Sequence, residues 1–510
     1  MTLEFARLRP PLIRPGLRNG CVLIRVAPGG AADCECLADE VSCRSRMTDG
    51  DRRFLRTSRR SVLPNLQGVC PMTHPDAHHA KFSSRRQFIK ASTALAAAVA
   101  VPSLGAARSV HAAGSDVITI GMIGCGGRCA GAAHNALTAD PGTRLVAMSD
   151  LFMNRVQNAR QALRTSHPQQ VEVDDEHCFV GVDAYKQVVE SADVVLIACA
   201  AKFHPMYLMA GIQAGKHVFV EKPHAIDPAG IKVVNAATQL ARQKGIGILS
   251  GLQSRFQAAY RETMQRVLDG QIGKIVTIEE NFIRGPYGET RRPEGMRELE
   301  IQYGNQYRFS WLCGDDVTQS LVHNLDRATW ALGEAVPIRC HGLGGRSTSQ
   351  HLLGDVFDHH SVVYHYPNDV RLYAFCRTTF KCYNENSSII MGSRGIALPT
   401  AGRITGENPW SFKGPGDDPY VAEHKEFLAS IRAGTPLNCG EYMARSTLVA
   451  IMGQLSCYSG QEVSWEQAVK SDYCLLPKPE ECTWDMEPPT KPDANGVYPV
   501  CATPGITVNV

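Results

Sequence analysis

The stretch Asp116-Val-Ile-Thr-Ile-Gly-Met-Ile-Gly124, followed by Cys125-Gly126-Gly127, decides the fold of this 510-residue chain. A short apolar run that ends in glycine is typical of a strand buried in a parallel sheet. Glycines at the turn from such a strand into a helix let the backbone approach a pyrophosphate, whose charge then lies at the helix N-terminus. We therefore predict that a dinucleotide binds at this turn, held by Gly124, Cys125, Gly126, Gly127 and Arg128.

The second predicted strand, residues 144–150, ends in an acidic residue. A carboxylate at that point accepts hydrogen bonds from an adenosine ribose and repels a 2′-phosphate, so Asp150 favours NAD over NADP. Cys129 replaces the third glycine of the usual fingerprint, and a thiol is small enough to pack there with a slight displacement. A flavin or a nucleotide-sugar could use the same turn, and this alternative stays open.

Strands and helices alternate from residue 116 to residue 250. Helices are predicted at 129–138, 154–163, 185–191, 205–214 and 227–244, and further strands at 193–199, 216–220 and 245–250. This alternation predicts a parallel, doubly wound sheet, so we assign residues 114–253 to a Rossmann domain. Residues 254–480 form a second domain, in which 273–282 alternates as a half-buried strand and Pro367-Asn-Asp predicts a hairpin turn. Residues 481–510 are predicted to be a Pro-rich, irregular tail on the surface.

Residues 1–113 precede these domains and carry an export signal. Residues 1–71 contain twelve Arg and no Lys and show no sustained period; they are either disordered or upstream of a true start at Met72, which we favour. Ser83-Ser-Arg-Arg-Gln-Phe-Ile-Lys90, the apolar stretch 91–104 and small residues up to Ala113 form a twin-arginine signal peptide. We therefore assign 72–113 to this signal and expect export to the periplasm by the twin-arginine translocase. A chance Arg pair before an alanine-rich helix is the alternative.

Composition excludes several classes of partner. A formal net charge of +3 is too small to indicate nucleic acid or a membrane surface. No apolar stretch reaches about 18 residues, so we predict no membrane anchor. The cysteines after residue 113 are irregularly spaced, and a protein that folds in the cytoplasm before export is expected to keep them as free thiols. Asp358-His359-His360 lies in strand-like sequence, where neighbours point to opposite faces, so we predict no metal site.

His217-Val-Phe-Val-Glu221-Lys222-Pro223, downstream of Cys199-Ala-Ala-Lys-Phe-His204, resembles the glucose–fructose oxidoreductase, inositol dehydrogenase and rhizopine catabolism family (Gfo/Idh/MocA). Further matching segments are Leu312-Cys-Gly-Asp-Asp316, His323-Asn-Leu-Asp326, Ile390-Met-Gly-Ser-Arg-Gly395 and Glu423-His424. The resemblance covers roughly residues 116–480. It implies a Rossmann domain followed by an α/β domain with a mostly antiparallel open sheet, and an active site between them. Members act on sugars, cyclitols and their derivatives and assemble through the open sheet, so we expect a homo-oligomer.

Lys222 and His323 are the predicted catalytic residues. Oxidation of a secondary alcohol needs a base for the hydroxyl proton and a cation for the developing alkoxide. Lys222 ends a strand where doubly wound sheets bind ligands, and histidine titrates near neutrality. Both residues have a structural alternative. Lys222 pairs with Glu221 at the surface, and His323 pairs with Asp326, three positions later on the same helix. Many dehydrogenases of the family carry an Asp four residues before this His. The residue at that position here is Gln319, so the alternatives to simple dehydrogenation stay open.

The resemblance also implies that Cys199, His204, Glu221 and Lys222 contact the cofactor, with His204 at the nicotinamide end. The candidate substrate contacts are Arg255, Tyr287 and Asp326, although Arg255 and Tyr287 could equally be surface or packing residues. We expect an oxidoreductase that acts on a sugar-like substrate with tightly held NAD. Two alternatives are an NAD-dependent, redox-assisted glycoside hydrolase or lyase, and a sugar- or cofactor-binding protein without catalysis.

Overall fold

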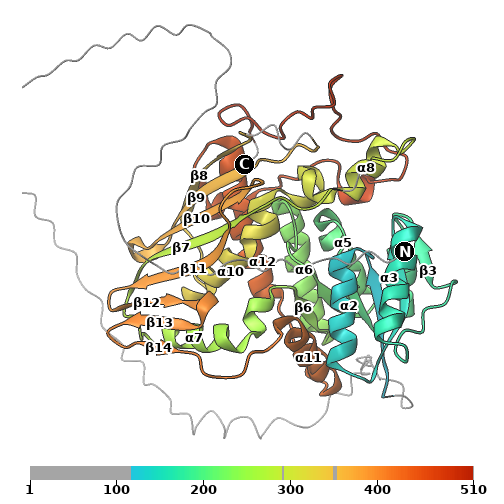
Figure 1. Cartoon of the computed structure of the whole chain (residues 1–510), viewed down its shortest axis with the longest axis horizontal. Helices are drawn as coiled ribbons and strands as arrows, with labels where there is room; N and C mark the ends of the chain where they lie inside the picture. The colour runs from blue at the N-terminus through green and yellow to red at the C-terminus, as the bar shows by residue number, and fades with distance from the viewer. Residues whose placement is uncertain (1–115, 290–291, 348–352, 509–510) are drawn as a thin grey trace, which may run out of the picture. The chain divides into compact units, whose positions relative to one another are not determined.

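Two β-sheets organise the protein in the computed structural model, which describes residues 116–289, 292–347 and 353–508 (Figure 1). Both sheets belong to one compact unit of the chain. The predicted extension 1–71 and the predicted signal peptide 72–113 lie outside the described residues. Within the described residues, no helix has the length and apolar character needed to cross a membrane.

The first sheet is the predicted doubly wound sheet. Its six strands are all parallel and lie in the order β3-β2-β1-β4-β5-β6. The strands are β1 Ile118–Ile123, β2 Thr143–Asp150, β3 Cys178–Val180, β4 Val194–Ile197, β5 His217–Val220 and β6 Ile248–Ser250. The helices between them are α2 Gly127–Ala139, α3 Met153–Ser166, α4 Tyr185–Ser191, α5 His204–Gln213 and α6 Pro228–Lys244. The sequence did not predict β3, because its three residues are too few to show a period.

Local sequence explains these elements. Every residue of β4 and of β5 is buried, as expected for strands covered by helices on both faces. Helix α6 begins where the Asp227 side chain accepts a hydrogen bond from the Gly230 N–H at 2.7 Å, with Pro228 in its first turn. It ends at Gly245, whose φ of 66° is left-handed.

The second sheet has nine strands in the order β14-β13-β12-β11-β7-β10-β9-β8-β15. Its central strand β7 pairs parallel with β10, and the other pairs are antiparallel, so the predicted mostly antiparallel sheet is confirmed. The predicted hairpin turn at Pro367–Asp369 joins β9 to β10. The strands are β7 Ile275–Arg284, β8 Arg339–Gly345, β9 His359–His365, β10 Arg371–Thr378, β11 Glu385–Gly392, β12 Gly395–Leu398, β13 Arg403–Gly406, β14 Trp410–Ser411 and β15 Val463–Ser464.

Helices cover one face of this second sheet. Helix α10, Val322–Ala331, packs on β7 and β11, and α12, Gly440–Ser459, packs on β8 and β9. The remaining helices of this part are α7 Ala258–Leu268, α8 Glu298–Gly304, α9 Ser310–Cys313, α11 Pro419–Arg432 and α13 Trp465–Lys470. Helix α11 packs on α2, so the later part of the chain also covers the first domain.

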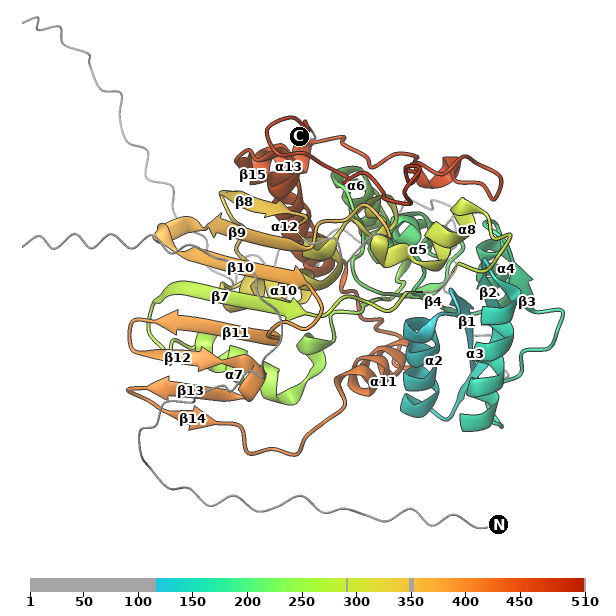
Figure 2. The same cartoon turned by 45° about the horizontal axis from the view of Figure 1, so that its top comes forward.

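After α13 the chain forms the irregular C-terminal segment that the sequence predicted. Apart from a short helical turn at Pro479–Glu481, residues 471–508 form no helix or strand. This segment is nevertheless packed, because Cys482, Tyr498 and Ala502 are buried. Figure 2 shows it running from α13 to the neighbourhood of α8.

Candidate functional site

The turn after β1 has the backbone geometry that its glycines predict. Gly124 has a φ of 94°, and a Cβ at this position would lie 2.9 Å from the carbonyl oxygen of Ala198. Only glycine fits such a turn without strain. Around Gly126 and Gly127 nothing lies within 4 Å of where a Cβ would stand. The start of α2 is therefore open to a ligand, as binding of a pyrophosphate at a helix N-terminus requires.

Asp150 ties the end of β2 to this turn. One carboxylate oxygen accepts a hydrogen bond from the Cys125 N–H at 2.7 Å, and the other accepts one from the Phe152 N–H at 3.1 Å. The carboxylate also lines the cavity beside Gly124 and Gly126. It is thus fixed by the backbone at the place where a ribose hydroxyl would need an acceptor.

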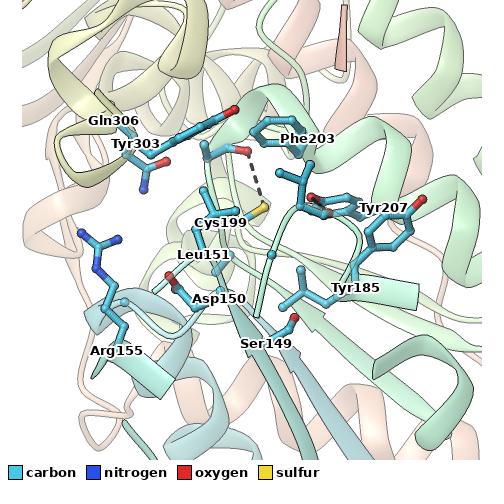
Figure 3. A pocket seen from close by; sticks show the side chains of 17 residues that line it. Ser149, Asp150, Leu151, Arg155, Tyr185, Cys199, Phe203, Tyr207, Tyr303 and Gln306 are labelled. Carbon is cyan, nitrogen blue, oxygen red and sulfur yellow. Dashed lines mark hydrogen bonds between the residues drawn. The ribbon is translucent and has the colours of Figure 1, made fainter. Parts of the chain in front are cut away.

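Two adjoining cavities follow this turn, with volumes of about 680 Å³ and 970 Å³. They share Gly126, Arg155, Ala198 and Gln306. Figure 3 shows the first, with Ser149 and Asp150 on one side and Tyr303 and Gln306 on another. Cys199 lines the first cavity and Arg128 the second. A glycine turn, a fixed acid and continuous open space together fit a dinucleotide.

Cys129 occupies the position of the third fingerprint glycine without blocking the packing of α2. Its side chain is buried, and Sγ lies 3.8 Å from the Ile123 carbonyl oxygen and 3.7 Å from that of Leu196. Burial raises the pKa of Cys129 to about 12. A neutral thiol therefore fills the contact between the helix and strands β1 and β4.

Lys222 follows β5 and reaches the second domain. Its ammonium group donates to the backbone carbonyl of Gln319 at 2.8 Å. Gln319 lies in a single π-helical turn, Val317–Leu321, that leads into α10. Such turns interrupt the regular i→i−4 bonding of a helix, and here a carbonyl oxygen accepts from a side chain. The alternative pairing with Glu221 is not observed, because Glu221 is buried and bound by Arg128 at 2.9 Å.

His323 lies one helical turn after Gln319, in the first turn of α10. Its Nδ1 has no hydrogen-bond partner among the residues that the structure describes. Burial, then the charges of Lys222 and Arg327, hold the pKa of His323 well below its usual range. The imidazole is therefore neutral at neutral pH, as a proton acceptor must be.

Two further histidines support the strand ends. His204 is buried, with Nδ1 2.7 Å from the Pro223 carbonyl oxygen and Nε2 3.2 Å from that of Cys199. Burial lowers the pKa of His204 to about 4, so the ring is neutral and its single N–H can donate to only one of these two carbonyls. His224, which the sequence did not single out, lies between Thr447 and Ser250 at 2.9 Å from each hydroxyl. Its position directly after Glu221-Lys222-Pro223 could have identified His224 from the sequence.

Tyr287 lines a third cavity, of about 310 Å³, together with Gln319. Its ring stacks on Tyr307 with centroids 4.2 Å apart. In the same cavity Arg284 and Asp316 form an ion pair at 2.6 Å. The sequence did not predict Arg284 or Tyr307, since residues of separate elements meet here.

Arg255 and Asp326 do not reach any of these three cavities. Arg255 binds both carboxylate oxygens of Asp326 at 2.8 to 3.0 Å, and the Ser446 hydroxyl donates to the same carboxylate at 2.7 Å. Asp326 is buried, and Arg255 also pairs with Glu334. This geometry gives the two residues a packing role, so the predicted contact with substrate is not supported. Because Asp326 binds Arg255 and Ser446, the alternative in which Asp326 pairs with His323 is not observed.

Within the described residues, no three His, Cys, Asp or Glu side chains are grouped so that they could hold a metal ion. Asp358 instead accepts hydrogen bonds from Ser347 and lies 2.6 Å from His359 Nδ1. His360 points to the other side of the strand, where its Nε2 lies 3.5 Å from Asp315. The thirteen cysteines that the structure describes are all free thiols.

Comparison with known protein families finds two matches. Residues 118–248 match the Gfo/Idh/MocA model, described as an oxidoreductase family with an NAD-binding Rossmann fold. Residues 83–102 match the signal sequence of the twin-arginine translocation pathway. The predicted resemblance to this family is thereby confirmed for the NAD-binding domain, and the predicted export signal is confirmed for residues 83–102.

Two curated relatives illustrate the range of similar proteins. Inositol 2-dehydrogenase 2 of Saccharopolyspora erythraea is 27% identical over 222 residues, which is 43% of this chain and 55% of that protein. Glycosyl hydrolase family 109 protein 1 of Bacteroides fragilis is 27% identical over 171 residues, which is 33% of this chain and 35% of that protein. The matches thus span about half or less of these relatives.

Solved structures share the fold over more of the chain. An aldose–aldose oxidoreductase from Caulobacter crescentus has a TM-score of 0.54 at 18% identity and covers 68% of this chain and 99% of its own. A myo-inositol 2-dehydrogenase from Lactobacillus plantarum has a TM-score of 0.51 at 18% identity, with the same two coverages. At these identities the likeness shows the fold alone.

Proposed function

We propose that this chain is an exported, NAD-dependent oxidoreductase that acts on a sugar, cyclitol or derivative. The match of residues 118–248 to the Gfo/Idh/MocA oxidoreductases and the match of residues 83–102 to a twin-arginine signal support this proposal. One observation carries the proposal. The Lys222 ammonium is anchored on the Gln319 carbonyl, one helical turn before the neutral imidazole of His323. Lys222 is thus bound at Gln319 and His323 lies four residues later, so a fixed cation and a proton acceptor are both attached to the start of α10.

Each residue has a distinct role in hydride transfer. The Lys222 ammonium stabilises the oxygen of the substrate as it becomes an alkoxide. The His323 imidazole accepts the hydroxyl proton and returns it in the reverse reaction. His204, held between two backbone carbonyls, keeps the ends of β4 and β5 in place. Bound NAD supplies the hydride acceptor, and Gly124, Gly126, Gly127, Cys199 and Asp150 would surround it.

The dinucleotide is proposed to be NAD rather than NADP. The Asp150 carboxylate is held in place by the Cys125 and Phe152 N–H groups. A 2′-phosphate placed beside it would meet a like charge that cannot move away. We expect Asp150→Ala to weaken binding of NAD and to reduce the preference for NAD over NADP.

The cofactor is proposed to stay bound through the catalytic cycle. A protein exported in the folded state to the periplasm works where no pool of nicotinamide replaces a lost cofactor. The hydride must therefore pass to a second substrate or return to the first. Buried free thiols, such as Cys129 and Cys313, agree with folding in the cytoplasm before export.

A redox-assisted glycoside hydrolase is the second candidate, because one relative carries the name glycosyl hydrolase and because Gln319 stands where a carboxylate is usual. Such an enzyme oxidises a sugar hydroxyl to a ketone, eliminates the glycosidic substituent, adds water to the resulting unsaturated ketone and returns the hydride. Lys222 and His323 suit both reactions, so their geometry does not separate the two. The products distinguish the two reactions, because only the second reaction cleaves a glycoside without a net change in oxidation state.

The outer face of the second sheet supports a homo-oligomer. Leu343, Tyr373 and Ile396, from three different strands, are exposed large hydrophobic residues, and each alternates with buried neighbours that face the opposite side of the sheet. Exposed apolar side chains grouped on a sheet mark association surfaces. We propose that copies of this chain pair through this face, which light scattering of the purified protein would test.

Purification of the exported protein tests the proposed function. A panel of sugars, cyclitols and glycosides is added to the protein, and the absorbance of its bound nicotinamide is followed. The proposal predicts that at least one sugar or cyclitol reduces the bound cofactor. A protein that binds no dinucleotide and responds to no member of the panel would contradict it.

A further inference from the structure

The wall of the first cavity opposite Asp150 comes from the second domain. Tyr303, on α8, and Gln306, just after it, line this cavity together with Phe203 and Asp150 (Figure 3). Helix α8 has only seven residues, Glu298–Gly304, and a helix this short is not stable without contacts outside itself. What holds α8 in place therefore also holds this wall of the cavity.

On one side α8 is held by the Rossmann domain and by its own neighbours. Arg155, on α3, donates to the Gly304 carbonyl at 3.1 Å. The Trp311 indole N–H donates to the Gln302 side chain at 2.8 Å. Both bonds lie at the carboxyl-terminal end of the helix, and the rest of α8 needs other partners.

The C-terminal segment supplies those partners. The Tyr498 hydroxyl donates to Glu298 at 2.5 Å, at the first residue of α8. Gln302 donates to the Thr490 carbonyl at 2.7 Å. Arg297, the residue before the helix, donates to Asp485 at 3.1 Å. Three residues far apart in the segment thus bind the same short helix along its length.

Trp484 joins both sides of the cavity. Its ring lies parallel to that of Tyr303, with an interplanar angle of 3° and centroids 6.2 Å apart. It also meets the edge of Phe152 at 5.8 Å and 72°. Phe152 follows Asp150 by two residues and donates its N–H to that carboxylate. One indole therefore contacts both the wall on α8 and the loop that carries the ribose-binding acid.

We infer that the C-terminal segment braces the outer wall of the dinucleotide site from behind and that Trp484 sets how slowly the dinucleotide leaves. This inference rests on the proposed function, since it requires a dinucleotide in the first cavity. Trp484 is a positioning residue: it holds Tyr303 and the loop after β2 together across the cavity without lining the cavity itself. Release of the ligand requires these two walls to separate, and the two aromatic contacts oppose that separation.

Trp484→Ala tests the inference, with Trp410→Ala as its matched control. Both tryptophans are half-buried, and an arginine lies over each ring: Arg297 over Trp484 at 5.1 Å and Arg266 over Trp410 at 4.4 Å. Trp410, however, belongs to the edge strand β14. Bound NADH is released by dilution into excess NAD, and the loss of its fluorescence gives the dissociation rate. We expect release about tenfold faster from Trp484→Ala, as the loss of two aromatic contacts predicts, and an unchanged rate from Trp410→Ala.

Two further variants keep the test decisive. Trp484→Phe retains an aromatic ring and should restore most of the slow release. Tyr498→Phe removes only the hydroxyl that binds Glu298, so it should accelerate release by a smaller factor even if Trp484→Ala does not fold. Wild-type release rates in Trp484→Ala and Tyr498→Phe would overturn the inference. A wild-type protein that binds no dinucleotide would instead overturn the proposed function.

Discussion

The turn at Gly124 and the turn at Gln319 both bring backbone polar groups to the site, but in different ways. At Gly124 a positive φ and the absence of a side chain open the start of α2. At Gln319 a π-helical turn places a carbonyl where the Lys222 ammonium can reach it. The first device requires a particular residue, glycine. The second requires only a backbone path, which many residues can follow. A substitution should therefore matter greatly at one turn and little at the other.

Lys222→Ala is expected to have the largest effect. It removes the cation that faces the developing alkoxide, and losses of this kind cost about 10²- to 10³-fold in kcat. No ion in solution replaces a charge fixed in the cleft, so the loss should persist at every pH. Single-turnover reduction of the bound cofactor measures it, and Lys222→Arg is the control that keeps the charge. Near-normal turnover in Lys222→Ala would place the chemistry elsewhere.

His323→Ala should cost about 10²-fold, the usual contribution of one proton acceptor. Unlike the loss from Lys222→Ala, this loss should shrink at high pH, where hydroxide can accept the proton. In the wild type, burial lowers the pKa of His323, so its neutral form persists as the pH falls. Wild-type activity should therefore stay constant as the pH falls through about 6.5, the ordinary pKa of histidine. A pH–rate profile of both proteins checks this, and an acid limb near that pH in the wild type would contradict it.

Gly124→Ala tests the other turn, at which glycine itself is required. The new Cβ would sit 2.9 Å from the Ala198 carbonyl oxygen in a left-handed region, a strain of about 1–3 kcal/mol. We expect a lower melting temperature and a weaker rise of that temperature on addition of NAD. Gly131→Ala, further along α2, is the matched control, because its Cβ would meet only the Arg128 side chain at 3.8 Å. Equal effects of the two substitutions would show that the turn does not need glycine where we place it.

Gln319→Ala should have the smallest effect, with kcat within about twofold of the wild type, since the carbonyl that binds Lys222 remains. Gln319→Asp adds a carboxylate near His323, which should raise the imidazole pKa and move the acid limb of the profile upward. If the enzyme cleaves glycosides, the same change should leave cleavage unaltered or impaired. A large loss in Gln319→Ala would mean that its side chain, rather than its backbone, acts in the site.

The sequence predicts features that depend on local pattern. The glycine turn, the acid at the end of β2, the caps of α6 and the hairpin at Pro367–Asp369 all follow from neighbouring residues, and the structure has each of them. The lysine at the end of β5 follows from its place after a strand and from the resemblance of Glu221-Lys222-Pro223 to the family motif. The glycine turn, the end of α6 and the hairpin depend on backbone conformations that few residue types can adopt.

Features that depend on distant pairing do not follow from local pattern. Arg255 and Asp326 resemble substrate contacts until the fold shows that they bind each other across 71 positions. The position of the Gln319 carbonyl that accepts from Lys222 depends on how α10 begins, and no residue type marks a π-helical turn. Trp484 lies in a stretch without any period, so its contacts with Phe152 and Tyr303 are visible only in three dimensions.

The most direct test of the account is the content of the exported protein itself. The protein is purified from the periplasm, denatured, and the released small molecules are identified by mass spectrometry. The account predicts about one NAD per chain, which stays bound through purification and is reduced in the native protein by a sugar or cyclitol. A native protein that contains no dinucleotide and gains no thermal stability from added NAD would contradict the account.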